Sequence, residues 1–301
     1  FYLPKYFLIN KLVNFKNHIN PLTEFTGAFN IRDRPDYKRV NQEFSFGWIF
    51  HEKKNITWHI NPLLISVVDV DLSPEFQEQI EDFNDSYISA SFQDHVVAGG
   101  VFSFEFNNQK LNYNSNALYF KTTFESAGGA LFRIHELIQK EKNILTNSYD
   151  FLGIRYAHFQ KSTLDLRYYQ NLLKESKMVY RFFSGIGIPR NNLKEALPFE
   201  KSFFAGGSNS LRAWRARSLG PGGYYDSAGK FDKIGDIKFE GNLEYRFPLS
   251  KWLEGAMFMD FGNIWLMGYD SLRPDGQFKW NNAINQVAIG GGLGLRLNFE
   301  Y

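Results

Sequence analysis

The stretch IKFEGNLEYRF, residues 237–247, alternates between two kinds of side chain. Its odd-numbered positions are apolar apart from Gly241, and its even-numbered positions carry Lys, Glu, Asn, Glu and Arg. Successive side chains of an extended chain point to opposite faces, so this pattern predicts a β-strand with one apolar and one polar face.

The same alternation recurs along most of the sequence. Phe102, Phe104 and Phe106, for example, alternate with Ser103 and Glu105. The pattern predicts ten strands, at residues 20–31, 39–51, 56–70, 86–106, 112–126, 150–170, 176–189, 236–247, 255–266 and 286–298.

The composition of the 301 residues excludes several classes of protein. The net charge of +2, from 34 basic and 32 acidic residues, argues against a dedicated nucleic-acid binder. The sequence has no cysteine, which excludes disulfide scaffolds and thiol nucleophiles, and its six scattered histidines predict no metal site. No window reaches the roughly 18–20 apolar residues that a membrane helix needs. The opening residues lack the features of a signal peptide, and we expect them to continue a longer chain.

Aromatic residues make up 18% of the sequence, and large ones dominate the apolar faces of the predicted strands. The opposite faces carry many charges, which suits a barrel with lipid outside and water inside. Every second link between strands is expected to be long. The short links are 52–55, 107–111, 171–175 and 248–254, and the long ones are 71–85, 127–149, 190–235 and 267–285, with 32–38 on the long side. Because outer-membrane barrels have short periplasmic turns and long extracellular loops, we predict an all-β fold, a transmembrane antiparallel β-barrel of the bacterial outer membrane.

Two of the long links contain helix signals. Residues 73–75 read Ser-Pro-Glu, which supplies an N-cap, a proline in the first turn and an early acid for a helix that continues to residue 83. Apolar residues of the segment 130–140 recur at helical spacing. We therefore expect two short helices on extracellular loops.

The long link 190–235 is unlike a solvated spacer. From Phe203 it reads FFAGGSNSLRAWRARSLGPGG, with paired Phe, a Gly pair, Trp beside Arg, and a Gly-Pro-Gly-Gly end. Glycines next to aromatic residues indicate backbone packed closely against a wall. Loops of this length are usually functional or disordered, and this composition favours a functional loop.

Two further stretches follow this loop, residues 242–248, NLEYRFP, and 258–263, FMDFGN. The three motifs, in this order and spacing between residues 203 and 263, resemble the BamA/TamA-type outer-membrane assembly family, in which the two stretches correspond to the strands after the lumen-folded loop. The loop motif itself is a Gly-Gly, a hydrophobic-Arg-Gly-aromatic run and a Gly-Pro, and is represented by Gly206, Gly207, Leu211, Arg212, Ala213, Trp214, Gly220 and Pro221. Ala213 departs from the family's Gly, and Ala would cost about 1 kcal/mol if that position were left-handed. The abundance of Phe resembles members of the family from the Bacteroidota.

The resemblance implies a barrel of sixteen strands, of which this chain would supply about ten, from about the fifth to the fourteenth. Residues 1–301 would then form a partial outer-membrane β-barrel domain, with about 190–235 folded into its lumen. An open piece of barrel would leave unpaired strand edges in lipid, so the missing strands are expected elsewhere in the full protein or in a swapped partner.

The alternation also places two acids where such a loop would meet them. Glu244 and Asp260 lie on the polar faces of consecutive predicted strands, and Phe258 shares the face of Asp260. Because a guanidinium binds carboxylates bidentately, we expect Arg212 to latch the loop to both acids, and the resemblance implies the same set with Phe258 beside it. The glycines at 290, 292 and 294 would leave room against the wall or bend their strand.

The resemblance implies a factor that inserts or translocates outer-membrane proteins. Its partners would be outer-membrane lipid, client outer-membrane or surface proteins and accessory lipoproteins. We expect no catalytic residue, metal or cofactor, and no enzymatic activity. Three alternatives remain: a two-partner secretion transporter within the family, a passive porin or receptor barrel, and a soluble β-sandwich binding module. A porin's constriction loop does not need an arginine facing acids on those two strands.

Overall fold

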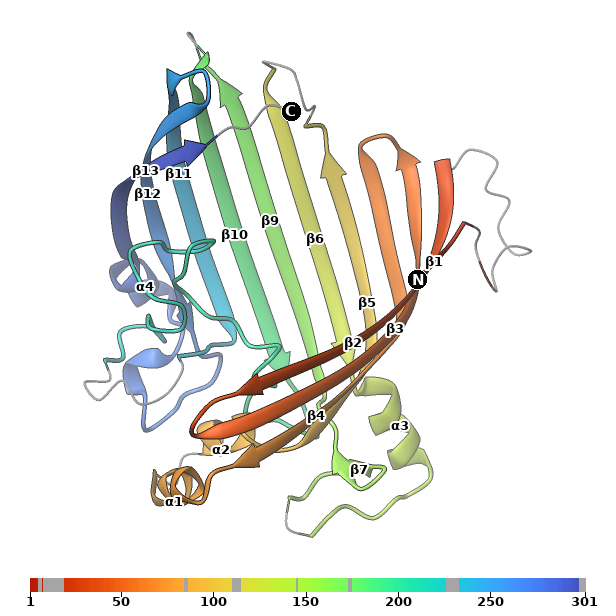
Figure 1. The fold of residues 1–301 in the computed structure, drawn as a ribbon. Coiled ribbons are helices and arrows are strands. Elements are labelled where there is room, and N and C mark those ends of the chain that lie inside the picture. Colours follow the sequence, from red (N-terminus) through yellow and green to blue (C-terminus); the bar gives the residue numbers. More distant parts are fainter. Residues whose placement is uncertain are drawn as a thin grey trace. The chain divides into compact units, whose positions relative to one another are not determined.

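The fold is a single large β-sheet with helices and turns in its connections (Figure 1). The computed structural model describes residues 1–4, 7, 19–83, 86–109, 115–144, 146–172, 175–225 and 233–297. The sheet has 11 strands in the order β1-β2-β3-β4-β5-β6-β9-β10-β11-β12-β13. Their bounds are β1 Tyr2–Leu3, β2 Ile19–Asp33, β3 Tyr37–Lys53, β4 Ile56–Leu72, β5 His95–Asn107, β6 Ala117–Ala127, β9 Phe159–Asn171, β10 Lys177–Pro189, β11 Ile237–Ser250, β12 Leu253–Trp265 and β13 Ala288–Leu297. Strands β1 to β4 pair antiparallel with their neighbours, and so do β10 to β13.

Each of the ten predicted strands corresponds to one long strand, from β2 to β13, but the strands predicted at 86–106 and 150–170 begin nine residues later than expected, at His95 and Phe159. Residues 86–94 were expected to be extended, yet Ser86–Ser91 form helix α2. Tyr87, Ile88 and Ser91 share one side of that helix and are buried, and the Ser91 hydroxyl donates to the Tyr87 carbonyl at 2.9 Å. Burial of this side therefore outweighs the local alternation.

The second correction concerns residues 150–158, where a small hairpin replaces the expected strand. Its two strands are β7 Asp150–Phe151 and β8 Ile154–Arg155. Leu152 and Gly153 between them have φ values of 54° and 83°, so the backbone turns back before β9 begins. The continuous alternation gave no sign of this turn.

The links between strands alternate between short and long as expected, with one exception. Only residues 34–36 separate β2 from β3, so the expectation that this link belongs to the long set is wrong. Asp33 lies opposite Lys38 in the ladder, and this pair of opposite charges continues the two strands toward the turn. The link from β5 to β6 is longer than expected, and the predicted strand residues 112–114 lie outside the described residues.

Both predicted helices are present, as α1 Pro74–Phe83 and α3 Gly129–Leu137. The Ser73 hydroxyl accepts a hydrogen bond from the Phe76 amide at 3.2 Å, as the capping signal predicts. Three short helical segments in the last link were not predicted: η2 Pro274–Gly276, α4 Trp280–Ala283 and η3 Ile284–Gln286. Among the described residues, no helix has the length and apolar character to cross a membrane.

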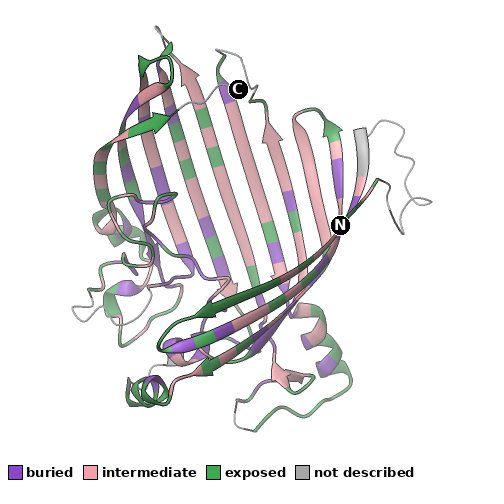
Figure 2. Ribbon diagram, viewed as in Figure 1, coloured by how far each residue is buried: buried purple, intermediate pink, exposed green. Residues whose placement is uncertain are grey.

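The chain divides into two compact units that each contain parts of several strands. Unit 1 comprises Phe1–Phe104, Thr123–Ser162 and Gly187–Lys201, and unit 2 comprises Glu105–Thr122, Thr163–Ile186 and Ser202–Tyr301. Burial varies along the strands (Figure 2), and partly buried and exposed positions alternate over most of β13. In β12 the apolar side chains of Met257 and Met259 are exposed, whereas Asp260 is fully buried. In this part of β12 the apolar side chains are thus the exposed ones, as expected for strands that face lipid.

In unit 1 a compact apolar cluster holds a loop against the strands. Its buried members are Leu64, Val97, Ala127, Ala157, Phe159, Leu193 and Leu197. Leu197, from the long link after β10, is 1% exposed. A Cβ atom added to Gly187 would lie 2.4 Å from Leu197 Cδ1, so the glycine makes room for this side chain.

Leu197→Ala should lower the free energy of unfolding by about 2–5 kcal/mol, because it removes buried methyl groups and leaves a cavity. Leu137→Ala removes the same atoms from a side chain that is 82% exposed, and should change it by less than about 0.5 kcal/mol. Urea unfolding of the full-length protein in detergent micelles, followed by tryptophan fluorescence, measures both. Equal losses in the two variants would contradict this packing.

Candidate functional site

From Ser202 on, the link between β10 and β11 belongs to unit 2 and folds back onto the sheet. Phe203 and Gly235 exchange backbone hydrogen bonds of 2.9 Å in both directions, which closes the neck of this loop. Farther along, Ala205 and Leu219 form a second bridge. A buried apolar cluster fixes the loop to the sheet, and its members are Phe203, Ala205, Leu211 and Ile264 of β12, none more than 6% exposed.

The glycine pair starts the turn at the tip of the loop. Gly206 and Gly207 have φ values of 92° and 100°, a region that side chains rarely adopt. A Cβ atom at Gly206 would lie 2.1 Å from the Arg215 carbonyl oxygen. The Gly207 amide donates to the Trp214 carbonyl at 2.8 Å, so the turn closes on itself and presents Arg212.

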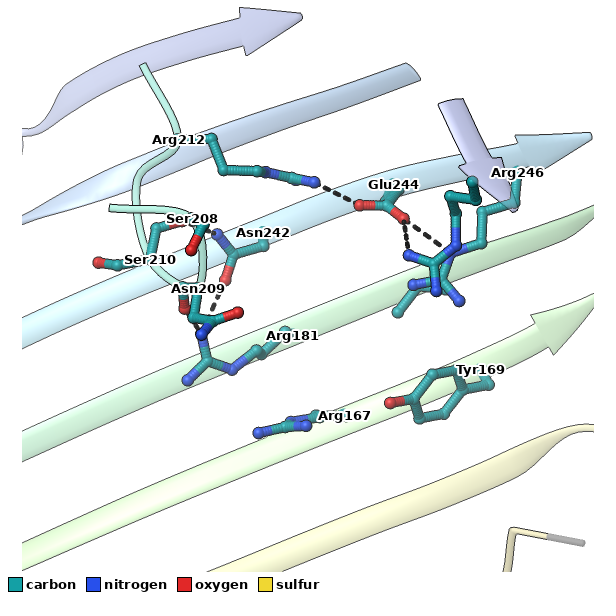
Figure 3. A pocket seen from close by; sticks show the side chains of 12 residues that line it. Arg167, Tyr169, Arg181, Ser208, Asn209, Ser210, Arg212, Asn242, Glu244 and Arg246 are labelled. Atoms are coloured by element: carbon teal, nitrogen blue, oxygen red, sulfur yellow. Dashed lines mark hydrogen bonds and ion pairs between the residues drawn. The ribbon is translucent and has the colours of Figure 1, made fainter. Parts of the chain in front are cut away.

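Arg212 is the centre of the polar contacts at the tip. Its Nη2 and Nε atoms donate to the two carboxylate oxygens of Asp260 at 2.7 and 2.9 Å, and its backbone amide donates to Asp260 Oδ2 at 2.9 Å. Its Nη1 atom donates to Glu244, as Figure 3 shows. The guanidinium carbon lies 3.6 Å from the centre of the Phe258 ring, which adds a cation–π contact. The fork geometry of arginine thus satisfies two acids at once.

The register of β11 and β12 explains why the two acids are close together. Asn242 lies opposite Asp260, and Glu244 lies opposite Phe258, so all four face the loop. The Asn242 amide donates to Asp260 Oδ1 at 3.0 Å. The Asp260 side chain is 0% exposed, so these donors replace the water that its charge has lost.

The remaining residues of the loop motif pack against the neighbouring wall. Ala213 is not among the residues with positive φ, so the strain that its replacement of Gly would bring does not arise. A Cβ atom at Gly290 would lie 2.6 Å from Ala213 Cβ and 2.9 Å from the Trp214 ring. The wall glycine therefore makes room for the loop. Gly220 has φ 85°, and its peptide bond to Pro221 is cis.

A second ionic cluster beside the tip was not predicted. Arg181 Nη1 lies 2.7 Å from Glu240 Oε1, and Arg181 Nε lies 3.2 Å from Asp165 Oδ1. Lys238 Nζ lies 2.7 Å from Glu240 Oε2, and the Ser210 hydroxyl of the loop donates to Glu240. Lys238 and Glu240 lie on the predicted polar face of residues 237–247, but only the pairing of the strands shows which residues they meet.

Unit 1 contains a further anchor that sequence reasoning missed. Glu200, in the link after β10, lies 2.9 Å from Arg39 Nη1 and 3.2 Å from His95 Nε2. The Arg39 side chain is 4% exposed, and its guanidinium carbon lies 4.3 Å from the centre of the Phe199 ring. Burial by itself would raise the pKa of Glu200, but the hydrogen bond with His95 and the charge of Arg39 hold it at about 2.

The contacts of Arg212 can hold the loop against the sheet. The partners are guanidinium, carboxylate and amide groups that already satisfy one another. Within the described part of the chain, no three His, Asp or Glu side chains are grouped closely enough to hold a metal ion. The structure thus brings together Arg212, Glu244, Asp260 and Phe258, and their role as a functional latch stays a prediction.

Arg212→Ala and Asp260→Ala should each lower the free energy of unfolding by about 3 kcal/mol, because each leaves a largely buried charge without its partner. The measurement is denaturant unfolding of the full-length protein in micelles. Arg215→Ala is the matched control, because Arg215 lies on the same loop and is exposed. If Arg212→Ala lowers the free energy of unfolding no more than Arg215→Ala does, the contacts at the loop tip add nothing to stability.

Glu200→Gln should show a stability deficit that depends on pH. Because the pKa of Glu200 is about 2, against an ordinary 4.5, its charge stabilises the folded chain above about pH 4.5 and stops doing so as the pH falls through about 2. The difference in thermal midpoint between wild type and Glu200→Gln should therefore shrink between these values. Glu141→Gln, which changes an exposed carboxylate, should follow the wild-type curve. A Glu200→Gln deficit that stays constant down to pH 2 would refute the ion pair.

Comparison with known proteins agrees with this fold. The family model described as the Omp85 superfamily domain matches residues 22–299. The crystal structure of BamA from Haemophilus ducreyi lacking POTRA domains 1-3 is similar with a TM-score of 0.62 and 14% identity, over 98% of this chain and 54% of that one. CdiB from Acinetobacter baumannii gives a TM-score of 0.49 and 14% identity, over 93% of this chain and 40% of that one. No curated protein sequence matches this one.

The chain spans about half the length of the BamA chain. That likeness, at 14% identity, concerns the fold. Together with the family model and the antiparallel pairing of the strands, it confirms the predicted all-β fold class of a transmembrane antiparallel β-barrel. The family model extends over nearly all of the sequence, including the loop with Arg212 and the strands with Glu244 and Asp260. The chain therefore belongs to the Omp85 superfamily.

Proposed function

We propose that this chain is the barrel portion of a factor that inserts or translocates other outer-membrane or surface proteins. The observation that carries the proposal is the contact of Arg212 with Asp260 and Glu244 within an Omp85 superfamily domain. The loop is fixed by these charges, by its apolar cluster and by its glycine turn at the same time. A plain connection between two strands needs none of these.

In this proposal the loop lies in the barrel lumen and the long links face the outside of the cell. The latch keeps the wall formed by β10 to β13 rigid, so that movement of the barrel is confined to other strands. Clients would add a strand by edge pairing, in which main-chain hydrogen bonds provide the affinity. The partners would be outer-membrane lipid, the client proteins and accessory lipoproteins. No chemical step is part of this function.

Two alternatives make different demands on the same loop. A two-partner secretion transporter would pass one dedicated substrate instead of inserting many clients. A passive porin would keep its pore open, and its constriction loop would not need to be tied to β11 and β12. The ties to Asp260 and Glu244 favour a barrel whose lumen is obstructed.

Arg212→Ala should reduce insertion of clients several-fold, because the loop loses its contact with both acids. The full-length protein is reconstituted in liposomes, an unfolded outer-membrane β-barrel protein is added, and the fraction that becomes protease-resistant is measured over time. Asp260→Ala should behave in the same way, and Arg215→Ala should insert clients like wild type.

Wild-type protein that leaves the client fully protease-sensitive would contradict the proposed function. Conductance in planar bilayers separates the porin alternative, because a large steady current indicates an open pore and a small flickering current an obstructed one. Export of one co-expressed substrate, without insertion of unrelated barrels, would favour the secretion transporter.

A further inference from the structure

A water-accessible cavity of about 510 Å³ lies in unit 2 beside the loop tip (Figure 3). Residues 208–210 and Arg212 of the loop form one side, and strands β9, β10, β11 and β13 supply the rest. Five arginines line it, namely Arg167, Arg181, Arg212, Arg246 and Arg296. Among the described residues that line it, Glu244 is the one carboxylate.

The charges around the cavity are arranged in two layers. The acidic partners lie behind, since the side chains of Glu240 and Asp260 are 0% exposed and that of Glu244 is 11% exposed. The arginines lie in front, with Arg167 at 37% and Arg296 at 48% exposed. The cavity therefore presents guanidinium groups to water although the charges of the whole cluster nearly balance.

Arg167 and Arg296 are the most exposed of the five arginines, since the side chains of Arg181, Arg212 and Arg246 are 20–23% exposed. Arg167 binds Asp165 through Nε and Nη2, at 3.0 and 2.7 Å, and a guanidinium has five N–H donors. Arg296 has only long contacts among those described, at 3.4 Å to Glu244 and 3.8 Å to Glu254. Both side chains can therefore donate to an incoming anion without breaking a short internal ion pair.

The neutral side chains of the cavity add donors and acceptors suited to a polypeptide. Tyr169, Ser208, Asn209 and Asn242 line it between the arginines. The side-chain amide of Asn209 can pair with the main chain of an extended peptide, whereas that of Asn242 already binds Ser210, Asp260 and Arg181. Glu244 in the lining repels a multiply charged phosphate more than a singly charged carboxylate.

We propose that this cavity binds an acidic peptide segment, whose carboxylates bind Arg167 and Arg296. The assignment rests on the proposed function in one respect, since a protein that handles polypeptide clients is one that meets such segments. The client segments that bind here would be rich in Asp or Glu, and they would be held beside the loop tip during passage or insertion.

The test measures binding of fluorescein-labelled hexaglutamate to the full-length protein in micelles by fluorescence anisotropy, with hexaglutamine as the neutral peptide. Hexaglutamate should bind more tightly than hexaglutamine, and added salt should weaken it because screening reduces the attraction. Arg167→Gln and Arg296→Gln should each weaken binding about three- to tenfold, the loss expected for one partly exposed charged hydrogen bond. Arg133→Gln removes the same charge from an 80% exposed side chain of α3, outside the cavity, and should bind like wild type.

Three results would overturn the assignment. These are equal binding of hexaglutamate and hexaglutamine by wild type, unchanged binding in the Arg167→Gln/Arg296→Gln double variant, and binding of inorganic polyphosphate without binding of hexaglutamate. The first and third need no variant, so they apply even if the double variant does not fold. If the wild-type protein inserts clients but does not bind the peptide, the peptide site is wrong and the proposed function stands. If it binds the peptide but inserts no client, the proposed function is wrong and the peptide site stands.

Discussion

The buried carboxylate of Asp260 is the constraint on which the rest of this region depends. An ionised side chain with 0% exposure has lost its water, and the fold must supply donors in place of that water. Arg212 supplies three of them and Asn242 a fourth. Because Arg212 belongs to a loop and Asp260 to β12, solvation of this one acid ties the path of the loop to the wall.

Several features of the sequence follow from this requirement. The glycine pair at 206 and 207 turns the chain so that Arg212 reaches the wall, and Gly290 leaves the space that Ala213 and Trp214 fill. The polar faces of β11 and β12 carry Glu244, Asn242 and Asp260 in neighbouring positions. The cationic cavity beside the tip has the same arrangement, because the acids are buried beneath its lining and the arginines are exposed to the water that fills it.

Much of the fold could be predicted from alternation alone, because period two is a local property of each strand. The stretch 237–247 and nine others were recognised in this way, and the parity of Glu244 and Asp260 placed them on one face. Residues 86–91 could not be assigned correctly, because burial of Tyr87 and Ile88 against the rest of unit 1 favours a helix. The turn at Leu152 and Gly153, where φ is positive, likewise could not be inferred from the alternation.

The ion pairs outside the family motif could not be predicted from the sequence for a different reason. Arg181 and Glu240 are separated by 59 positions, and their contact depends on how β10 is paired with β11. The contact of Arg39 with Glu200 depends on the path of a loop between two distant segments. A single sequence shows which face a residue occupies but not which residue on a neighbouring strand it meets.

A double-mutant cycle on Arg212 and Asp260 tests the central claim most directly, with unfolding of the full-length protein in micelles as the measured quantity. If these side chains bind each other as described, Arg212→Ala/Asp260→Ala will be less destabilised than the sum of its single variants, with a coupling energy of about 1–3 kcal/mol. Strictly additive losses would mean that the two side chains do not interact, and the proposed latch would be wrong.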